Sequence, residues 1–168
     1  GSLPRDKFAF FLRQDYLFLI EYSRVLAIAS AKAPDLAGMT RLAELMHATL
    51  TVEMQPHRSY CAWFDFTPEQ PERTRIAPAT SAYTRYLVSI AYEGSIQEIA
   101  AALLPCQWGY SEIGLHLAAH GDTSEKNPYA GWIETYASDD FCELGEWLRG
   151  YLDAMAKSPT VDQRRRLE

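Results

Sequence analysis

Residues 95–120 read SIQEIAAALLPCQWGYSEIGLHLAAH, and this stretch predicts a long helix. Ser95 and Glu98 match the capping-box pattern, in which a serine hydroxyl and a carboxylate three residues later satisfy backbone N–H groups at a helix start. The apolar run that follows continues to His120 without a strand-like alternation. Pro105 lies in its middle and has no N–H group, so we expect a kink there.

Helical spacing also dominates the residues that precede this stretch. Apolar side chains recur every three or four positions over residues 4–33, which predicts a helix that begins near a proline and ends before Pro34. Asp35 is a candidate cap for a second helix. That helix should be kinked or interrupted at Pro56. A third apolar stripe predicts a helix over residues 83–94.

The remaining segments predict two loops and three further helical segments. Residues 65–78 hold three prolines and many charges and indicate a surface connection, and residues 121–128 have loop composition. A short helix is expected over 129–136, a longer one over 138–157 with a serine cap, and a last segment from 158 onward. Since no run alternates with period two, the sequence predicts an all-α domain of six or seven helices.

The composition is that of an ordinary globular chain. Hydrophobic residues make up 48% of the 168 residues and charged residues 23%, which suits a single domain with its own core. The formal net charge is -6, from 16 Lys and Arg against 22 Asp and Glu, and no dense basic stripe is present. Because phosphate backbones are bound by clustered cations, we expect no nucleic-acid partner.

Cysteine usage and hydropathy indicate the compartment. The three cysteines, Cys61, Cys106 and Cys142, are an odd number without framework spacing, which is typical of thiols in a reducing compartment. No apolar run reaches the roughly 18 residues that a membrane span needs, and no signal-peptide pattern opens the sequence. We therefore expect a cytoplasmic protein with no membrane partner.

Cys106 is the first candidate for chemistry. It directly follows Pro105, at the expected helix distortion, and Trp108 and Tyr110 are close in sequence. A thiol in this position can attack a flat ring substrate if its neighbours favour the thiolate. The alternative is a small buried hydrophobic residue beside a kink, which is the commoner situation and our interpretation of the other two cysteines.

Asp15 is the second candidate. It lies on or beside an apolar helix face, with Phe11, Phe18 and Tyr22 about one turn away. Such a carboxylate is solvated, paired or functional, because burial of an unpaired charge is costly. In an aromatic pocket it would suit the amine or amidine-like edge of a heterocycle. The alternative, a salt bridge to a nearby Arg or Lys, stays open at this point.

Histidine spacing raises the alternative of a metal site. Glu112, His116 and His120 lie at i, i+4 and i+8, and Glu53 with His57 forms a second i, i+4 pair. Together they could supply a carboxylate and histidine site in a helical bundle. However, His116 and His120 also lie near a helix end, where partly cationic imidazoles suit the helix dipole, and we favour that interpretation.

Three blocks of sequence together resemble one protein family. They are FLRQDYLFL at 11–19, AALLPCQWGYSEIG at 101–114 and NPYAGWIETYASDDF at 127–141. They occur in this order in the TenA / thiaminase II family, which the chain resembles over residues 1–157. The resemblance implies a haem-oxygenase-like all-α multi-helix bundle. It also implies an aminohydrolase in thiamin salvage that converts 4-amino-5-aminomethyl-2-methylpyrimidine, or thiamin itself, to the hydroxymethylpyrimidine without a cofactor or metal.

The resemblance assigns roles position by position. Cys106 matches the family's catalytic thiol, and Asp15 matches the carboxylate that holds the amino edge of the pyrimidine. Tyr83 and Tyr136 match tyrosines that hydrogen-bond around the thiol and the ring. Tyr110 matches an aromatic residue of the pocket wall. These assignments predict that the substrate is a small aminopyrimidine.

Other matched positions depart from the family or keep a structural role. Phe18 stands where some members have Tyr, so it can pack or stack on the substrate but offers no hydroxyl. Glu53 and His57 correspond to a family pair on the second helix, for which we prefer a structural role.

The resemblance also bears on boundaries and assembly. Family members continue beyond the position of Glu168 into a helix with a Glu before Phe-Trp, the expected acid and base. We therefore expect residues 1–168 to form a single TenA-like helical domain that lacks the family's first and C-terminal helices. The resemblance implies a homotetramer or homodimer.

Two other function classes stay open from the sequence. One is a metal-dependent or cofactorless oxidase of the haem-oxygenase-like superfamily, which the Glu112, His116 and His120 spacing would suit. The other is a pyrimidine-binding protein that does not catalyse a reaction.

Overall fold

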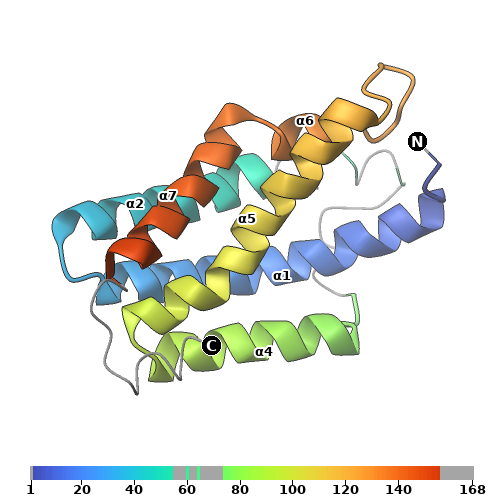
Figure 1. The fold of residues 1–168 in the computed structure, drawn as a ribbon. Coiled ribbons are helices and arrows are strands. Elements are labelled where there is room, and N and C mark those ends of the chain that lie inside the picture. Colours follow the sequence, from blue (N-terminus) through green and yellow to red (C-terminus); the bar gives the residue numbers. More distant parts are fainter. Residues whose placement is uncertain (1, 55–59, 61–63, 65–73, 156–168) are drawn as a thin grey trace. The chain divides into compact units, whose positions relative to one another are not determined.

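This computed structural model describes residues 2–54, Tyr60, Phe64 and residues 74–155. The described residues form six α-helices and one π-helix and contain no strand (Figure 1), which confirms the predicted all-α class. None of these helices combines the length and apolar character that a bilayer crossing requires. The chain divides into two compact units, residues 2–92 and residues 93–168 with Gly1, which are described in turn.

A helical hairpin forms the first unit's framework. Helix α1 spans Arg5–Lys32 and α2 spans Leu36–Ala48, with a three-residue connection between them. The predicted boundaries hold within one residue, since α1 starts just after Pro4 and stops before Pro34. Asp35 caps α2 as predicted, because its carboxylate accepts a hydrogen bond of 2.8 Å from the Gly38 N–H.

The second predicted helix changes its hydrogen bonding before it ends. Thr49–Glu53 form a π-helix, η1, which continues α2 and contacts α1. In a π-helix the N–H groups bond to carbonyls five residues earlier, so the turn is wider than an α-helical one. The sequence pattern gave no sign of this change. The kink expected at Pro56 lies outside the described residues.

The last helix of the first unit begins earlier than predicted. Helix α4 spans Pro78–Glu93, so it starts five residues before Tyr83. Proline suits a first helical position, because its fixed φ is helical and its missing N–H needs no partner there. The connection predicted over 65–78 ends at the residue where α4 begins, and its residues 65–73 lie outside the described part of the chain.

Side-chain hydrogen bonds tie α4 alongside α1 at both ends. Near the middle of α1, the Gln14 amide accepts a 2.8 Å hydrogen bond from the Ala77 N–H and donates to the Arg75 carbonyl at 3.2 Å. At the far end, the Lys32 ammonium donates to the Tyr92 carbonyl at 3.0 Å. Both helices therefore run in the same direction, as Figure 1 also shows.

Three helices make up the described part of the second unit. They are α5, Ile96–His120; α6, Ala130–Tyr136; and α7, Asp139–Met155. The predicted capping box starts α5, since the Glu98 N–H donates to the Ser95 hydroxyl at 3.3 Å and the Glu98 carboxylate accepts from the Ser95 N–H at 2.8 Å. Helix α5 then runs unbroken through Pro105.

Helix α7 returns along α5 and is fastened to it. The Ser138 hydroxyl accepts a hydrogen bond of 3.3 Å from the Phe141 N–H at the start of α7, which confirms the predicted serine cap. The buried Gln107 amide of α5 donates to the Phe141 carbonyl at 3.4 Å. The helix predicted to reach residue 157 is described to Met155, and the predicted last segment lies outside the described residues.

Candidate functional site

Within the first unit, the structure stacks two of the predicted site residues. The rings of Phe18 and Tyr83 lie 5.5 Å apart between centroids and are nearly parallel, at 8°. The parallel course of α1 and α4 explains the pairing: Gln14 is bonded to Ala77, and Phe18 and Tyr83 follow at four and six residues. Tyr22 extends this group, with its ring 5.4 Å from Phe18.

Asp15 is buried in the same unit, one turn before Phe18. Only 6% of its surface is exposed, and Phe18 is 7% exposed. Enclosing a carboxylate costs several kcal/mol unless hydrogen bonds or an opposite charge compensate, so this position is expensive for packing alone. An ionised carboxylate accepts hydrogen bonds and cannot donate them. Together with an aromatic pair, it suits a flat ligand that carries an amine.

The second unit carries the candidate thiol on α5. Cys106 is half-buried, and its i+4 neighbour Tyr110 is half-buried too. Residues four apart on an α-helix share a face, so Cys106, Tyr110 and Gly114 form one line along α5. Trp108 lies off this line, where its indole N–H donates to the Glu112 carboxylate at 3.1 Å.

An aromatic cluster covers this line from α6 and α7. The Tyr110 ring lies 5.0 Å from that of Tyr136 and 6.0 Å from that of Trp132. The Tyr136 ring also lies 4.5 Å from Trp132 and meets Phe141 edge-on at 4.9 Å. Such contacts fix ring orientations. The structure thus brings together Tyr110 and Tyr136, with Cys106 one turn away from Tyr110.

Gly114 sets how closely α6 approaches α5. A Cβ atom at this position would lie 2.5 Å from the carbonyl carbon and oxygen of Tyr136. Since backbone atoms cannot give way easily, only glycine allows Tyr136 to be held where it is. Sequence reasoning quoted Gly114 as part of a motif but gave it no role, although a glycine inside a helix is itself a signal of close packing.

Cys142 on α7 has surroundings unlike those of a nucleophile. Burial raises the pKa of its thiol above the ordinary 9.0, and the nearby carboxylates of Asp139, Glu112 and Glu146 raise the pKa further. A thiol of raised pKa stays protonated at neutral pH, and the thiolate is the reactive form. This agrees with the packing role predicted for Cys142. Cys61 lies outside the described residues.

The helical spacing of Glu112, His116 and His120, which suggested a metal site, does not bring three metal ligands together. Within the described residues, no group of three or more His, Cys, Asp or Glu side chains could hold an ion. His116 and His120 stack at 4.6 Å, and the His120 Nδ1 lies 3.0 Å from the His116 carbonyl oxygen. Glu53 is buried on η1, but its predicted partner His57 lies outside the described part of the chain.

Sequence reasoning gave no role to Gln14 or Thr49, two of the buried polar residues of the first unit. Gln14 fastens the start of α4 to α1, as described above. Thr49 begins η1 and is 0% exposed. A glutamine or threonine in a helical pattern carries no local signal of burial, so only the packed structure could reveal either one.

Comparison with known proteins shows which family this chain belongs to. The model of one family, described as TENA/THI-4/PQQC, matches residues 1–168. The chain belongs to the TENA/THI-4/PQQC family. The chain is 43% identical over its whole length to a protein of Halalkalibacterium halodurans named aminopyrimidine aminohydrolase. The match covers 75% of that protein. The chain is 33% identical over its whole length to a Helicobacter pylori protein of the same name, of which it covers 77%.

A solved structure extends the TENA/THI-4/PQQC comparison to the fold. A TenA family protein from a Silicibacter species, described as a transcription regulator, is 32% identical, with a TM-score of 0.89. The match covers 99% of this chain and 76% of that one. The family and the multi-helix fold implied by the three sequence blocks are thereby confirmed.

Proposed function

We propose that this chain is an aminopyrimidine aminohydrolase of the thiaminase II type, a hydrolase of thiamin salvage. Its substrate is 4-amino-5-aminomethyl-2-methylpyrimidine, and water replaces the amine to give the hydroxymethyl product and ammonia. The observation that carries the proposal is the 43% identity, over the full chain, to a protein named for this activity. The half-buried Cys106 beside the Tyr110 and Tyr136 cluster supports it.

The proposed mechanism uses the Cys106 thiol as a nucleophile. The sulfur adds to the ring carbon next to a ring nitrogen while a general acid protonates that nitrogen, which ends the aromaticity of the ring. The ring electrons then expel ammonia from the exocyclic methylene. Water adds to that methylene, the C–S bond breaks, and the aromatic ring and the thiol are restored.

The other site residues are proposed to bind and orient the substrate. Asp15 accepts a hydrogen bond from the amino group of the pyrimidine, which its buried carboxylate can do only as an acceptor. Phe18 and Tyr83 offer flat rings, and the Tyr136 hydroxyl hydrogen-bonds near the thiol. Tyr110 forms part of the pocket wall. We further propose that residues of both units serve a single TenA-like domain.

The test is turnover of 4-amino-5-aminomethyl-2-methylpyrimidine, followed as ammonia release and as formation of the hydroxymethyl product. The full chain and three variants are compared: Cys106→Ala, Cys106→Ser and Cys142→Ala. We expect both Cys106 variants to lose at least about 10³-fold in kcat, because the nucleophile is gone. The Cys142→Ala variant should keep the activity. Unchanged turnover in Cys106→Ala would refute the assignment of the nucleophile.

A second function is favoured by the Silicibacter protein, which is described as a transcription regulator. Under this alternative, the chain binds a pyrimidine and does not turn it over. Tight binding of 4-amino-5-hydroxymethyl-2-methylpyrimidine by calorimetry, with no ammonia released from the aminomethyl compound, would favour it over the hydrolase.

We also propose that the chain forms a homodimer or homotetramer and acts in the cytoplasm. A shallow apolar groove lined by residues of α2 and η1 supports association, with Leu36 76% and Val52 58% exposed. Exposed apolar patches of this kind are typical of protein interfaces. Sedimentation of the full chain and of Val52→Glu tests it: a monomer in the unmodified chain would reject the proposal.

A further inference from the structure

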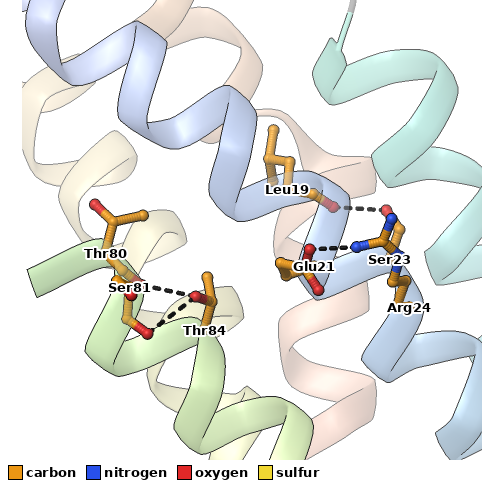
Figure 2. A network of polar contacts seen from close by, with 7 residues as sticks. All are labelled: Leu19, Glu21, Ser23, Arg24, Thr80, Ser81 and Thr84. Carbon is orange, nitrogen blue, oxygen red and sulfur yellow. Dashed lines mark hydrogen bonds and ion pairs between the residues drawn. The ribbon is translucent and has the colours of Figure 1, made fainter. Parts of the chain in front are cut away.

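The buried serine and threonine hydroxyls of the described residues differ in whether they have a hydrogen-bond partner. Four serine and threonine side chains are buried among the described residues: Ser23, Thr49, Thr84 and Ser111. Ser23, Thr84 and Ser111 each donate to a carbonyl oxygen three or four residues earlier, at 2.8 to 2.9 Å. Figure 2 draws the first two of these bonds. The Thr49 Oγ1 has no such partner, although Thr49 is the most deeply buried of the four.

The start of the π-helix explains why Thr49 differs. The Thr49 N–H donates to both the Leu45 and the Met46 carbonyl oxygens, which are the acceptors that its hydroxyl would ordinarily share. Thr51, two residues later and exposed, does bond back to the His47 carbonyl at 2.7 Å. π-Turns inside α-helices are frequent at functional sites. A buried hydroxyl without a partner in such a turn is a candidate ligand contact.

The hairpin register gives the level of Thr49 along α1. The Ser30 hydroxyl donates to the Met39 carbonyl at 2.9 Å, which sets these two residues level across α1 and α2. Ten residues onward from Met39 is Thr49, and ten residues back from Ser30 is Ile20, each about 15 Å along its helix. Because η1 contacts α1, Thr49 lies level with the turn that follows Phe18.

An aminopyrimidine carries a hydrogen-bond acceptor that would suit the unpartnered hydroxyl of Thr49. The amino edge of an aminopyrimidine offers an N–H donor and, beside it, a ring nitrogen that can only accept. The Asp15 carboxylate can satisfy the amine but cannot donate to the nitrogen. Glu53, the other buried polar side chain of η1, has the same limit when ionised. The hydroxyl of Thr49 is the buried group of η1 that can donate.

We propose that the Thr49 hydroxyl donates a hydrogen bond to the ring nitrogen beside the amino group of the bound aminopyrimidine. Thr49 is then a substrate-binding residue that contacts the same amino edge of the pyrimidine as Asp15. The inference depends on the proposed function, since it names a further contact for the same ligand.

The experiment compares Thr49→Val, which keeps the shape and removes the hydroxyl, with Thr49→Ser, which keeps the hydroxyl. Thr84→Val is the matched control, because its hydroxyl is buried but already bonded within α4. The measurements are KM for 4-amino-5-aminomethyl-2-methylpyrimidine, the Kd of the hydroxymethyl product by calorimetry, and the thermal midpoint of each variant.

We expect Thr49→Val to raise KM and Kd about tenfold, as for loss of one hydrogen bond in a buried site. Its thermal midpoint should stay equal or rise, because no intrahelical bond is lost. Thr49→Ser should keep the KM of the unmodified chain. Thr84→Val should keep KM and lower the thermal midpoint. Thr49→Ala also lacks the hydroxyl and replaces Thr49→Val if that variant fails to fold.

The outcomes separate this inference from the function itself. If the unmodified chain turns the substrate over and Thr49→Val matches its KM and Kd, the inference is wrong and the proposed function stands. Equal impairment of Thr49→Ser and Thr49→Val would also overturn it, because the hydroxyl would not matter. If the unmodified chain neither binds nor hydrolyses the pyrimidine, the proposed function fails and the inference fails with it.

Discussion

Two cysteines of the second unit differ in what surrounds each sulfur. Cys106 follows Pro105 on α5 and lies one turn from Tyr110, whereas Cys142 on α7 is near three carboxylates. Both were visible in the sequence, which separated them by the Pro105 and aromatic neighbours of Cys106 and by the family motif around it. The raised pKa of Cys142 gives an independent physical reason, because carboxylates from α5 and α7 meet there only after folding.

The pKa of Cys142 predicts its reactivity. Its folded pKa lies above 9.0, so the thiolate fraction, and with it the alkylation rate, should rise about tenfold from pH 7 to pH 8 and keep rising through pH 9. The stability that the protonated thiol contributes is complete below pH 9.0 and is lost as the pH rises through the folded pKa. Iodoacetamide labelling with peptide mass spectrometry measures this; a plateau below pH 8 would contradict it.

Asp15 predicts a loss of binding without a loss of fold. Asp15→Asn should raise KM about 10-fold to 100-fold, because a hydrogen bond to a charged acceptor contributes about 1.5–3 kcal/mol. The thermal midpoint of the variant is measured as well, so that a loss of binding is distinguished from a loss of fold. Asp35→Asn is the control, because asparagine caps a helix as well as aspartate does. Equal KM values for the two variants would count against the role of Asp15.

At the scale of whole elements, two glycines of α5 lead to opposite expectations. Gly114→Ala should destabilise the chain by about 1–3 kcal/mol and lower kcat, because its Cβ would meet the Tyr136 backbone at 2.5 Å. Gly109→Ala has nothing within 4 Å of the added Cβ and should stabilise the helix by about 0.5–1 kcal/mol. Urea unfolding of both variants, with their kcat, measures the difference.

The opposite signs are what make the glycine pair informative. If Gly114→Ala proved as stable as Gly109→Ala, α6 would not be held against α5 at this point. A kcat that fell in Gly109→Ala alone would show that helix flexibility, and not the position of Tyr136, limits the reaction.

The whole molecule should respond to its ligand. A ligand that binds only the folded chain stabilises it by about 2.7 kcal/mol at 100 times its Kd. For a chain of this size, the hydroxymethylpyrimidine should therefore raise the thermal midpoint by about 5–10 °C. The same compound without its amino group should give a much smaller shift, because Asp15 loses its hydrogen-bond donor. Equal shifts from both compounds would argue against recognition of the amino edge.

The candidate site residues are divided between the two units. Asp15, Phe18 and Tyr83 lie in the unit of residues 2–92, and Cys106 and Tyr136 lie in the other. The family resemblance had assigned roles to residues in all of these segments. Within each unit, the structure adds the ring contacts and the fastening bonds that composition and spacing do not encode.

The sequence by itself determined the helices, most of their ends and the family. Asp35, Ser95 and Ser138 are capping residues whose hydrogen bonds reach only three positions along the chain, so local pattern was sufficient for them. The start of α4 at Pro78 was within reach of the same rules but was predicted too late.

Only the tertiary structure decided which side chains meet. The stack of Phe18 on Tyr83, the approach of Tyr136 to Gly114 and the buried hydroxyl of Thr49 all join or expose groups through packing between helices. Helical periodicity states that a face is apolar, but it does not state which other face covers it or at what register. That choice depends on contacts across space, and it is what turns a set of helices into a candidate site.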